Sequence, residues 1–234
     1  MNPRDRLIVA LDVPDVDAAR RLLDRLAGRA GMFKVGKQLF TAAGPGLVTE
    51  LVARGEKVFL DLKYHDIPNT MAGAVKAAVT LGVSLVDVHG LAGPVAIESA
   101  AGAIGNAATR LIAVTVLTSH DDATLAAIGL RGPVPEAVRR LALLAQAAGA
   151  HGVVASPHEV RLIRDACGDQ FLIVTPGVRP SGSAMGDQAR AATPAAALSA
   201  GADYLVVGRP ITEAADPAAA ADAIVGEIAS APRP

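Results

Sequence analysis

The sequence predicts an α/β protein with a single domain, a (β/α)8 TIM barrel that spans residues 1–234. Eight short runs of apolar and β-branched residues recur along the chain, and stretches with helical spacing separate them. The 234 residues, 51% of them apolar, suffice for one large core and match the usual size of such a barrel. No linker divides the chain, so two smaller domains are not expected.

The expected strands are near-continuous apolar strings, which is typical of parallel strands covered on both faces. They span residues 7–13, 32–36, 57–63, 84–90, 111–117, 151–156, 171–177 and 204–209. Helical patterns such as 16–30 and 69–82 lie between them, and several end in glycine. A longer gap after the fifth strand, TSHDDATLAAIGLRGPVP, indicates an insertion at the barrel mouth. A doubly wound open sheet is the alternative, but the first strand leads into DVPDVD rather than a glycine-rich dinucleotide turn.

Composition excludes several classes of partner. The net charge of −1 has no basic patch for nucleic acid or anionic membrane, and 3% aromatic residues cannot build a base-stacking platform. No apolar run is long enough to span a bilayer, and the first residues lack the apolar core of a signal peptide. The single cysteine, Cys167, is interpreted as a small residue near a helix end. A cytoplasmic protein is therefore expected, with residues 230–234 as a disordered tail.

Charged residues interrupt the apolar strands at the ends that form the barrel mouth, where such barrels carry their functional groups. Lys34, Asp61 and Lys63 are the clearest cases. Residues two apart on a strand share a face, so Asp61 and Lys63 point into the mouth if Phe59 points inward. Buried charges are seldom unpaired, so we expect Asp61, Lys63 and Asp66, which lie within six residues of one another, to be mutually paired.

Asp66 follows the same strand and precedes IPNT, where Pro68 suits the first turn of a helix. Capping of that helix is an alternative to a role in the site, and spacing alone does not separate the two.

A phosphate site is expected after the last two strands. TPGVRPSGSAMGDQAR follows the seventh strand and VVGRPIT follows the eighth, the usual position for phosphate in these barrels. Arg179 and Arg209 offer forked donors, and residues 179–190 suit a lid over the ligand. A solvated surface loop is the alternative reading of that segment.

The five histidines show no metal-ligand spacing, so no metal site is expected. His65 and His89 lie near the mouth, and His89 is interpreted as a structural residue at a strand end.

Together these segments resemble the orotidine 5′-phosphate decarboxylase family. DLKYHDIPNT carries the D-x-K-x-x-D signature, and LIVALDV, FKVG, TVLTS, VTPGVRP…GDQAR and GADYLVVGRPIT resemble other family segments in the same order. The match runs from about residue 7 to residue 213. The D-x-K-x-x-D element alone also occurs in related Mg²⁺-dependent barrels, the keto-gulonate phosphate decarboxylases and hexulose phosphate synthases.

The resemblance implies a homodimer that converts orotidine 5′-monophosphate into UMP and CO2 in pyrimidine biosynthesis, with no metal or organic cofactor. It implies that Lys63 is the proton donor and that Asp61 lies beside the substrate carboxylate. Lys34 and Asp66 would complete an alternating row of charges, with Asp66 reaching into the partner's site. The substrate contacts it implies are made by Asp12, Lys34, Asp61, Ile67, Thr70, Thr118, Pro176, Arg179, Gln188, Gly208 and Arg209. Ser181 in the lid receives no role.

Two other functions remain open at this point. One is a Mg²⁺-dependent sugar-phosphate decarboxylase or aldolase on the same barrel, against which the lid, Gln188 and Lys34 argue. The other is a catalytically silent nucleotide-binding barrel, against which the intact set of Asp61, Lys63 and Asp66 argues.

Overall fold

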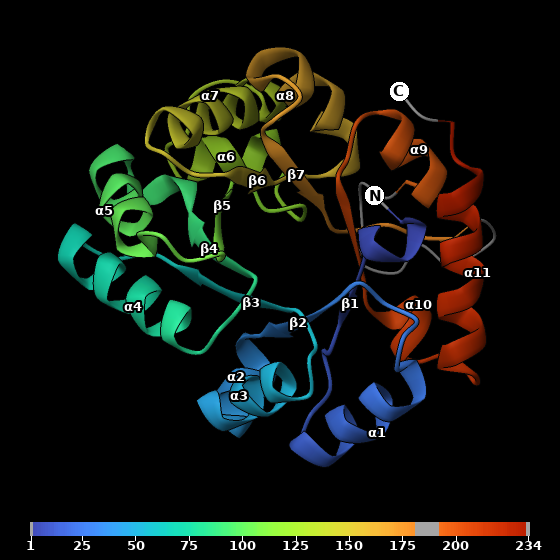
Figure 1. The fold of residues 1–234 in the computed structure, drawn as a ribbon. Helices are drawn as coiled ribbons and strands as arrows, with labels where there is room; N and C mark the ends of the chain where they lie inside the picture. Colours follow the sequence, from blue (N-terminus) through green and yellow to red (C-terminus); the bar gives the residue numbers. More distant parts are fainter. Residues whose placement is uncertain (1, 181–191, 233–234) are drawn as a thin grey trace.

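Eight parallel strands form a closed barrel surrounded by helices in a computed structural model that describes residues 2–180 and 192–232 (Figure 1). Each strand pairs with its neighbours in sequence, and β1 pairs with β8, so the sheet has no open edge. This closure confirms the predicted (β/α)8 barrel and rules out the open-sheet alternative. Because the strands run parallel, their carboxyl ends share one mouth.

Most strands are shorter than the apolar runs that predicted them, whereas β2 and β3 have the predicted lengths. Their bounds are β1 Leu7–Ala10, β2 Met32–Gly36, β3 Val58–Tyr64, β4 Leu85–His89, β5 Arg110–Val114, β6 Gly152–Val154, β7 Leu172–Thr175 and β8 Tyr204–Val207. The runs extend further because the chain stays buried past the strand ends. Leu11 and Val116, for example, lie outside the strands but are almost fully buried.

The helices follow the strands and form the outer layer of Figure 1. Their bounds are α1 Val16–Leu26, α2 Lys37–Ala43, α3 Pro45–Ala53, α4 Pro68–Thr80, α5 Pro94–Ile104, α6 Asp122–Ala127, α7 Val134–Ala147, α8 Val160–Cys167, α9 Pro194–Ser199, α10 Arg209–Thr212 and α11 Pro217–Ser230. Short 3₁₀ turns are η1 Pro3–Arg6, η2 Gly90–Ala92 and η3 Pro157–Glu159. Proline occupies the first turn of many of them, where its missing N–H costs nothing.

The insertion after β5 and the carboxyl-terminal segment can be compared with what the sequence predicted. The insertion after β5 is present and forms α6 and the loop that leads into α7. A disordered tail was expected from residue 230 to residue 234. Ser230 is instead the last residue of α11, and its Oγ donates a hydrogen bond to the Gly226 carbonyl. Residues 233–234 lie outside the described part of the chain.

The hydrophobic residues divide into two layers. The layer inside the barrel contains Ile8, Ala10, Met32, Phe59, Leu85, Ile112, Val174 and Val206. The larger layer lies between the strands and the helices. Both faces of the sheet are therefore buried, which explains the near-continuous apolar strands. Phe59 belongs to the inner layer, which meets the condition under which Asp61 was expected to point into the mouth, and Leu62 packs on the outer layer.

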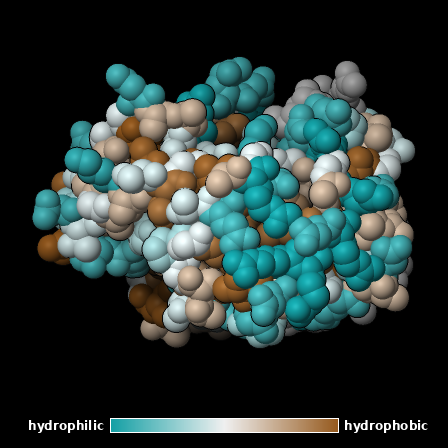
Figure 2. All heavy atoms as spheres, turned by 60° about the horizontal axis from the view of Figure 1, so that its bottom comes forward, coloured by the Kyte–Doolittle hydropathy of each residue, from teal (hydrophilic) through white to brown (hydrophobic). Residues whose placement is uncertain are grey.

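The outer surface of the helices is polar. The face in Figure 2 is mainly hydrophilic, with hydrophobic atoms in small groups. Charged side chains link neighbouring helices on the outside of the barrel, as Arg20 of α1 does with Glu50 of α3 at 2.7 Å. No helix in the described ranges is both long and apolar enough to cross a bilayer.

Candidate active site

Four charged side chains from neighbouring strands form a continuous row at the barrel mouth. Lys34 on β2 places its Nζ 2.9 Å from Asp12 Oδ1 and 3.2 Å from Asp61 Oδ2. The other oxygen of Asp61, Oδ1, pairs with the Nζ of Lys63, also on β3. The order is therefore Asp12, Lys34, Asp61, Lys63, with alternating signs. The expected pairing of Asp61 with Lys63 is confirmed, whereas Asp66 is in none of the ion pairs that the described residues make in this row.

The neighbouring opposite charges favour the ionised forms of the two buried members of this row, Asp61 and Lys34. Burial alone would raise the pKa of Asp61, but Lys34 and Lys63 outweigh it and lower that pKa to about 2. Burial likewise acts to lower the pKa of Lys34, and the carboxylates of Asp61 and Asp12 raise it instead. Side-chain exposure is 10% for Lys34 and 11% for Asp61. The site thus contains a fixed pattern of charge that solvent screens little.

Gly36, at the end of β2, leaves the space that this row needs. A Cβ atom at this position would lie 2.9 Å from Lys34 Nζ and 3.2 Å from Asp12 Oδ1. Any larger residue would displace the ammonium group or the carboxylate. Sequence reasoning did not identify this residue, although it ends the FKVG segment.

Lys63 reaches the mouth by a different backbone route from the one predicted. Simple alternation along a regular strand was expected, but the register between β3 and β4 shifts between Leu60 and Tyr64. Lys63 has a φ of 50°, the left-handed region, and it is the sole non-glycine residue with positive φ among the described ones. An unusual backbone conformation at a charged residue in a barrel mouth is typical of a functional site.

Asp87 on β4 holds this unusual backbone. Its Oδ1 accepts a hydrogen bond from the backbone N–H of Lys63 at 2.7 Å. Its Oδ2 lies 4.0 Å from Lys63 Nζ, and the side chain is completely buried. Burial and the neighbouring Asp61 raise the pKa of Asp87 well above its usual value. The sequence showed a charged residue inside an apolar strand here, but its link to Lys63 was not predicted.

The charged row borders a pocket of about 170 Å³ in the mouth. The pocket is lined by Lys34, Phe59, Asp61, Lys63, Val114, Val116, Leu117, Thr118, Val154, Ala155, Pro176 and Val206. Thr118 and Pro176, both predicted site residues, therefore lie with the charged row. The floor is apolar and the charges lie on one side, an arrangement that suits a flat ring with one reactive edge.

The predicted phosphate residues lie at the ends of β7 and β8. The charge of Arg209 contributes, after burial, to lowering the pKa of Arg179, so the two guanidinium groups are electrostatic neighbours. The backbone N–H of Arg179 donates to the Ala192 carbonyl at 2.9 Å, so the described chain on the two sides of residues 181–191 is joined by a hydrogen bond. Gly208 precedes α10 and faces Asp12, whose Oδ2 would be 3.7 Å from an added Cβ. Gln188 and Ser181, and most of the lid at 179–190, lie outside the described residues.

Asp66, Ile67 and Thr70 lie outside the pocket lining, and all three are exposed. Ile67 is 67% exposed. Asp66 Oδ1 accepts a hydrogen bond from the Ile67 N–H, but the helix cap is Ile67, which has no side-chain cap bond. The helix-capping alternative for Asp66 is therefore wrong, whereas Pro68 begins α4 as expected.

His65 and His89 stack beside the mouth, with ring centroids 5.5 Å apart. Burial, His65 and Lys63 lower the pKa of His89 to about 4, so this ring is neutral at pH 7. Its Nδ1 accepts a hydrogen bond from the Leu91 N–H at 3.3 Å, consistent with the structural role predicted for it.

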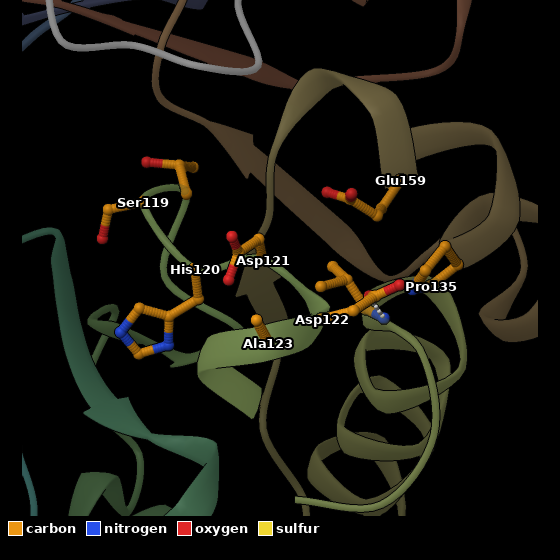
Figure 3. A pocket seen from close by; sticks show the side chains of 9 residues that line it. Ser119, His120, Asp121, Asp122, Ala123, Pro135 and Glu159 are labelled. Carbon is orange, nitrogen blue, oxygen red and sulfur yellow. Dashed lines mark hydrogen bonds between the residues drawn. The ribbon is translucent and has the colours of Figure 1, made fainter. Parts of the chain in front are cut away.

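A second hollow of about 570 Å³ lies beside the insertion after β5, and Thr118 lines both hollows (Figure 3). Two of its carboxylates, those of Asp121 and Asp122, accept local backbone hydrogen bonds. Asp121 accepts a bond from the Thr124 N–H at the start of α6, and Asp122 accepts one from the Val134 N–H. Among the described residues, no cluster of His, Cys, Asp and Glu could hold a metal ion. The smaller pocket, with its row of opposite charges, is therefore the better candidate site.

Comparisons with known proteins agree on one family. Residues 5–224 match the family described as orotidine 5′-phosphate decarboxylase / HUMPS. The chain is 61% identical to an orotidine 5′-phosphate decarboxylase of Halorhodospira halophila, with 97% of each chain covered. It is 56% identical to the enzyme of that name from Moorella thermoacetica, over 97% of this chain and 94% of the relative.

Solved structures show the same similarity. A crystal structure of orotidine 5′-phosphate decarboxylase from Lactobacillus acidophilus superposes with a TM-score of 0.84 at 40% identity, covering 95% of this chain and 98% of the other. An uncharacterized conserved protein from Geobacillus kaustophilus gives a TM-score of 0.83 at 37% identity, covering 95% of this chain and 99% of the other.

Proposed function

The chain belongs to the orotidine 5′-phosphate decarboxylase / HUMPS family, and on this premise we propose that it converts orotidine 5′-monophosphate into UMP and CO2, with Lys63 as the proton donor and with no metal or organic cofactor. The observation that carries the proposal is the Lys34–Asp61–Lys63 row beside an apolar pocket. The pyrimidine ring would lie on the apolar floor, with its C6 edge towards the charges.

The reaction needs a fixed cation at the carbon that loses CO2. Departure of CO2 leaves an electron pair on C6, and no obvious electron sink exists in the ring. The ammonium group of Lys63 stabilises this negative charge and then delivers a proton to the same carbon. Because Asp61 holds Lys63 Nζ directly, the cation is already oriented before the substrate binds.

Asp61 also acts on the substrate carboxylate. A carboxylate at this position repels the carboxylate of the bound nucleotide, and the repulsion disappears as CO2 leaves without charge. With a pKa of about 2, Asp61 stays ionised throughout the neutral range. Its two roles are compatible, because one oxygen contacts each lysine while the group as a whole faces the pocket.

Metal independence is supported by the way the charges pair. Both oxygens of Asp61 are already occupied by ammonium groups, from Lys34 at 3.2 Å and from Lys63. A divalent cation at Asp61 would have to displace one of them. The positive charge that the related Mg²⁺-dependent barrels draw from a metal is supplied here by lysine side chains.

Substrate phosphate would bind between Arg179 and Arg209, with Gln188 from the lid as a further donor. Two neighbouring guanidinium groups, Arg179 after β7 and Arg209 after β8, offer forked donors that suit a phosphate dianion. Phosphate binding far from C6 can still accelerate the reaction, because it positions the ring and closes the lid.

Arg209→Ala is expected to lower kcat/KM for orotidine 5′-monophosphate by roughly 100-fold or more, since a charge-assisted phosphate contact is lost. The truncated substrate orotidine, which lacks the phosphate, should be turned over equally by both enzymes. Arg161→Ala, which removes an exposed arginine on α8, serves as a matched control. An unchanged kcat/KM for the nucleotide would contradict the phosphate assignment.

We further propose a homodimer in which Asp66 and Thr70 enter the partner's pocket. Asp66, Ile67 and Thr70 are exposed at the mouth but do not line the pocket of their own chain. Exposed apolar residues follow the same strands, Ile67 after β3 and Leu91 and Val95 after β4. An interface over these residues would bury the apolar side chains and bring a further carboxylate to Lys63 of the partner.

The single cysteine, Cys167, cannot form a disulfide within the chain, which is consistent with the reducing cytoplasm that we propose as its location.

The function is tested by following the absorbance of orotidine 5′-monophosphate after adding purified protein in the presence of EDTA. We expect rapid loss of substrate absorbance and formation of UMP, unchanged by EDTA. Activity that requires added Mg²⁺ and acts on a keto-gulonate or hexulose phosphate would contradict the proposal and favour the related barrel enzymes. Binding of the nucleotide without turnover would indicate a silent nucleotide-binding barrel.

A further inference from the structure

We infer that Asp87 is a positioning residue for Lys63, and that its buried carboxyl group fixes the backbone from which the Lys63 ammonium is aimed at the substrate. The inference rests on the proposed function for its catalytic meaning, but its structural part can be tested without any activity. Asp87 touches no pocket space itself, since the pocket lining includes Lys63 and Asp61 but not Asp87.

The first support is the backbone of Lys63. A φ of 50° is unfavourable for a residue with a long side chain, so the surrounding structure must enforce it. The register shift between β3 and β4 removes regular ladder bonds at this point. The Lys63 N–H instead donates to Asp87 Oδ1 at 2.7 Å. The Asp87 carboxyl oxygen thus takes the place of the backbone acceptor that regular strand pairing would offer to the Lys63 N–H. Regular pairing would favour an extended conformation at Lys63.

The second support is the position of the other carboxyl oxygen. Asp87 Oδ2 lies 4.0 Å from Lys63 Nζ, and the Asp87 carboxyl group also interacts with that of Asp61. Asp87 therefore contacts Lys63 at its backbone and lies near its ammonium group. The Oδ1 atom of Asp61 pairs with the same ammonium group. Lys63 is fixed at both ends, its N–H and its Nζ.

Packing alone does not explain an acid at this position. Asp87 is fully buried between Val86 and Val88, and a buried carboxyl group is costly unless it makes a necessary contact. Burial and Asp61 raise the pKa of Asp87 well above its usual value, which shows that this environment disfavours the charge. An apolar residue would fill the space, but it would leave the Lys63 N–H without an acceptor.

Three variants separate these contributions. Asp87→Ala and Asp87→Leu both remove the acceptor, one leaving space and the other filling it, so at least one tests the contact even if the other folds poorly. Asp87→Asn keeps an acceptor oxygen at the same place and removes the acid. Thr109→Val is the stability control. Thr109 lies just before β5, at the opposite end of the barrel from the mouth, and its Oγ1 donates a buried hydrogen bond to the Val83 carbonyl, which the valine deletes.

The first readout is structural. Crystal structures of the Ala or Leu variant are expected to show Lys63 at negative φ, with its Nζ moved away from Asp61. The Asn variant should keep the positive φ. If Lys63 retains its conformation in the Ala or Leu variant, the inference is wrong, whatever reaction the protein catalyses.

The second readout is kinetic. The Ala and Leu variants should lose roughly 100-fold in kcat, the size expected when a catalytic group is misplaced by about 1 Å, while UMP binding stays within about threefold. The Asn variant should recover kcat to within about tenfold of wild type. The Thr109→Val control should lose thermal stability with unchanged kcat. Equal loss in the Asn and Leu variants would overturn the positioning role, because the acid and not the acceptor would then matter. Absence of activity in wild type would instead count against the proposed function and leave the structural readout intact.

Discussion

Lys63→Ala is expected to remove nearly all decarboxylase activity, with kcat lower by about 10⁴-fold or more, while the barrel still folds. Two separate contributions disappear together. Positioned proton transfer contributes roughly 10²- to 10⁴-fold, and a fixed charge at the developing anion contributes on the order of 10²- to 10³-fold. The two act through one group, so the total loss is less than their product but larger than either alone.

The fold should survive because the rest of the charged row remains paired. Asp61 keeps Lys34 at 3.2 Å after the substitution, so its carboxylate is not left alone in the mouth. Lys63 is also the more exposed of the two lysines, with 28% of its side chain accessible. We therefore expect a small change in melting temperature and retained binding of UMP, which has no C6 carboxylate to repel.

Three measurements check this prediction on the same preparation. Single-turnover kinetics with orotidine 5′-monophosphate report the chemical step, titration with UMP reports binding, and thermal unfolding reports the fold. Lys76→Ala, which removes an exposed lysine from α4, is the matched control and should behave as wild type. A Lys63→Ala enzyme within about tenfold of wild type in kcat would exclude Lys63 as the proton donor.

The fold was predictable because the signals for it are local. Apolar strands and intervening helices leave a periodic pattern in the sequence, and eight repeats in 234 residues leave few alternatives. Exact strand ends were less predictable. Leu11 and Val116 are apolar because loops near the mouth are buried as well, and no local pattern separates a buried strand residue from a buried loop residue.

Site residues at the ends of strands could be predicted from the sequence. Features of the site that depend on an irregular backbone conformation could not. Lys34, Asp61 and Lys63 could be brought together from topology alone, because neighbouring strands end at one mouth. The positive φ of Lys63 and its hydrogen bond to Asp87 could not be predicted. Both follow from a register shift between β3 and β4, and no residue of the DLKYHD segment indicates that shift. Asp66 marks a different limit, because the role proposed for it across an interface would involve residues of another chain, which the sequence pattern of one chain does not place.

The proposed role of Asp66 in the partner's site predicts a large effect on activity when two kinds of subunit are mixed. A mixture of two inactive variants, Lys63→Ala and Asp66→Ala, is expected to regain activity when their subunits exchange. Each heterodimer would contain one site with its own Lys63 and the partner's Asp66, both intact, and one site that lacks both. Random exchange of equal amounts makes half of the dimers heterodimers, so about a quarter of all sites should be wild type.

The geometry within one chain supports this arrangement. The charged row runs from Asp12 through Lys34 and Asp61 to Lys63, whose Nζ also lies 4.0 Å from the buried Asp87. Asp66 is exposed, and its Oδ1 accepts a hydrogen bond from the neighbouring Ile67 N–H at 2.7 Å. If Asp66 acted in its own site, every heterodimer site would lack either Lys63 or Asp66, and mixing would restore nothing.

The experiment distinguishes the two cases when heterodimers are isolated. Subunits with different affinity tags are exchanged by dilution and mild denaturant, and the doubly tagged dimers are purified. We expect these dimers to have about half of the wild-type kcat per dimer, with unchanged KM, because one of their two sites is intact. Exchange of Lys63→Ala with Lys76→Ala chains should also give half, and exchange of Lys63→Ala chains with themselves should give none. Doubly tagged Lys63→Ala/Asp66→Ala dimers without activity would show that each chain completes its own charged row, with Asp66 moving inward rather than across.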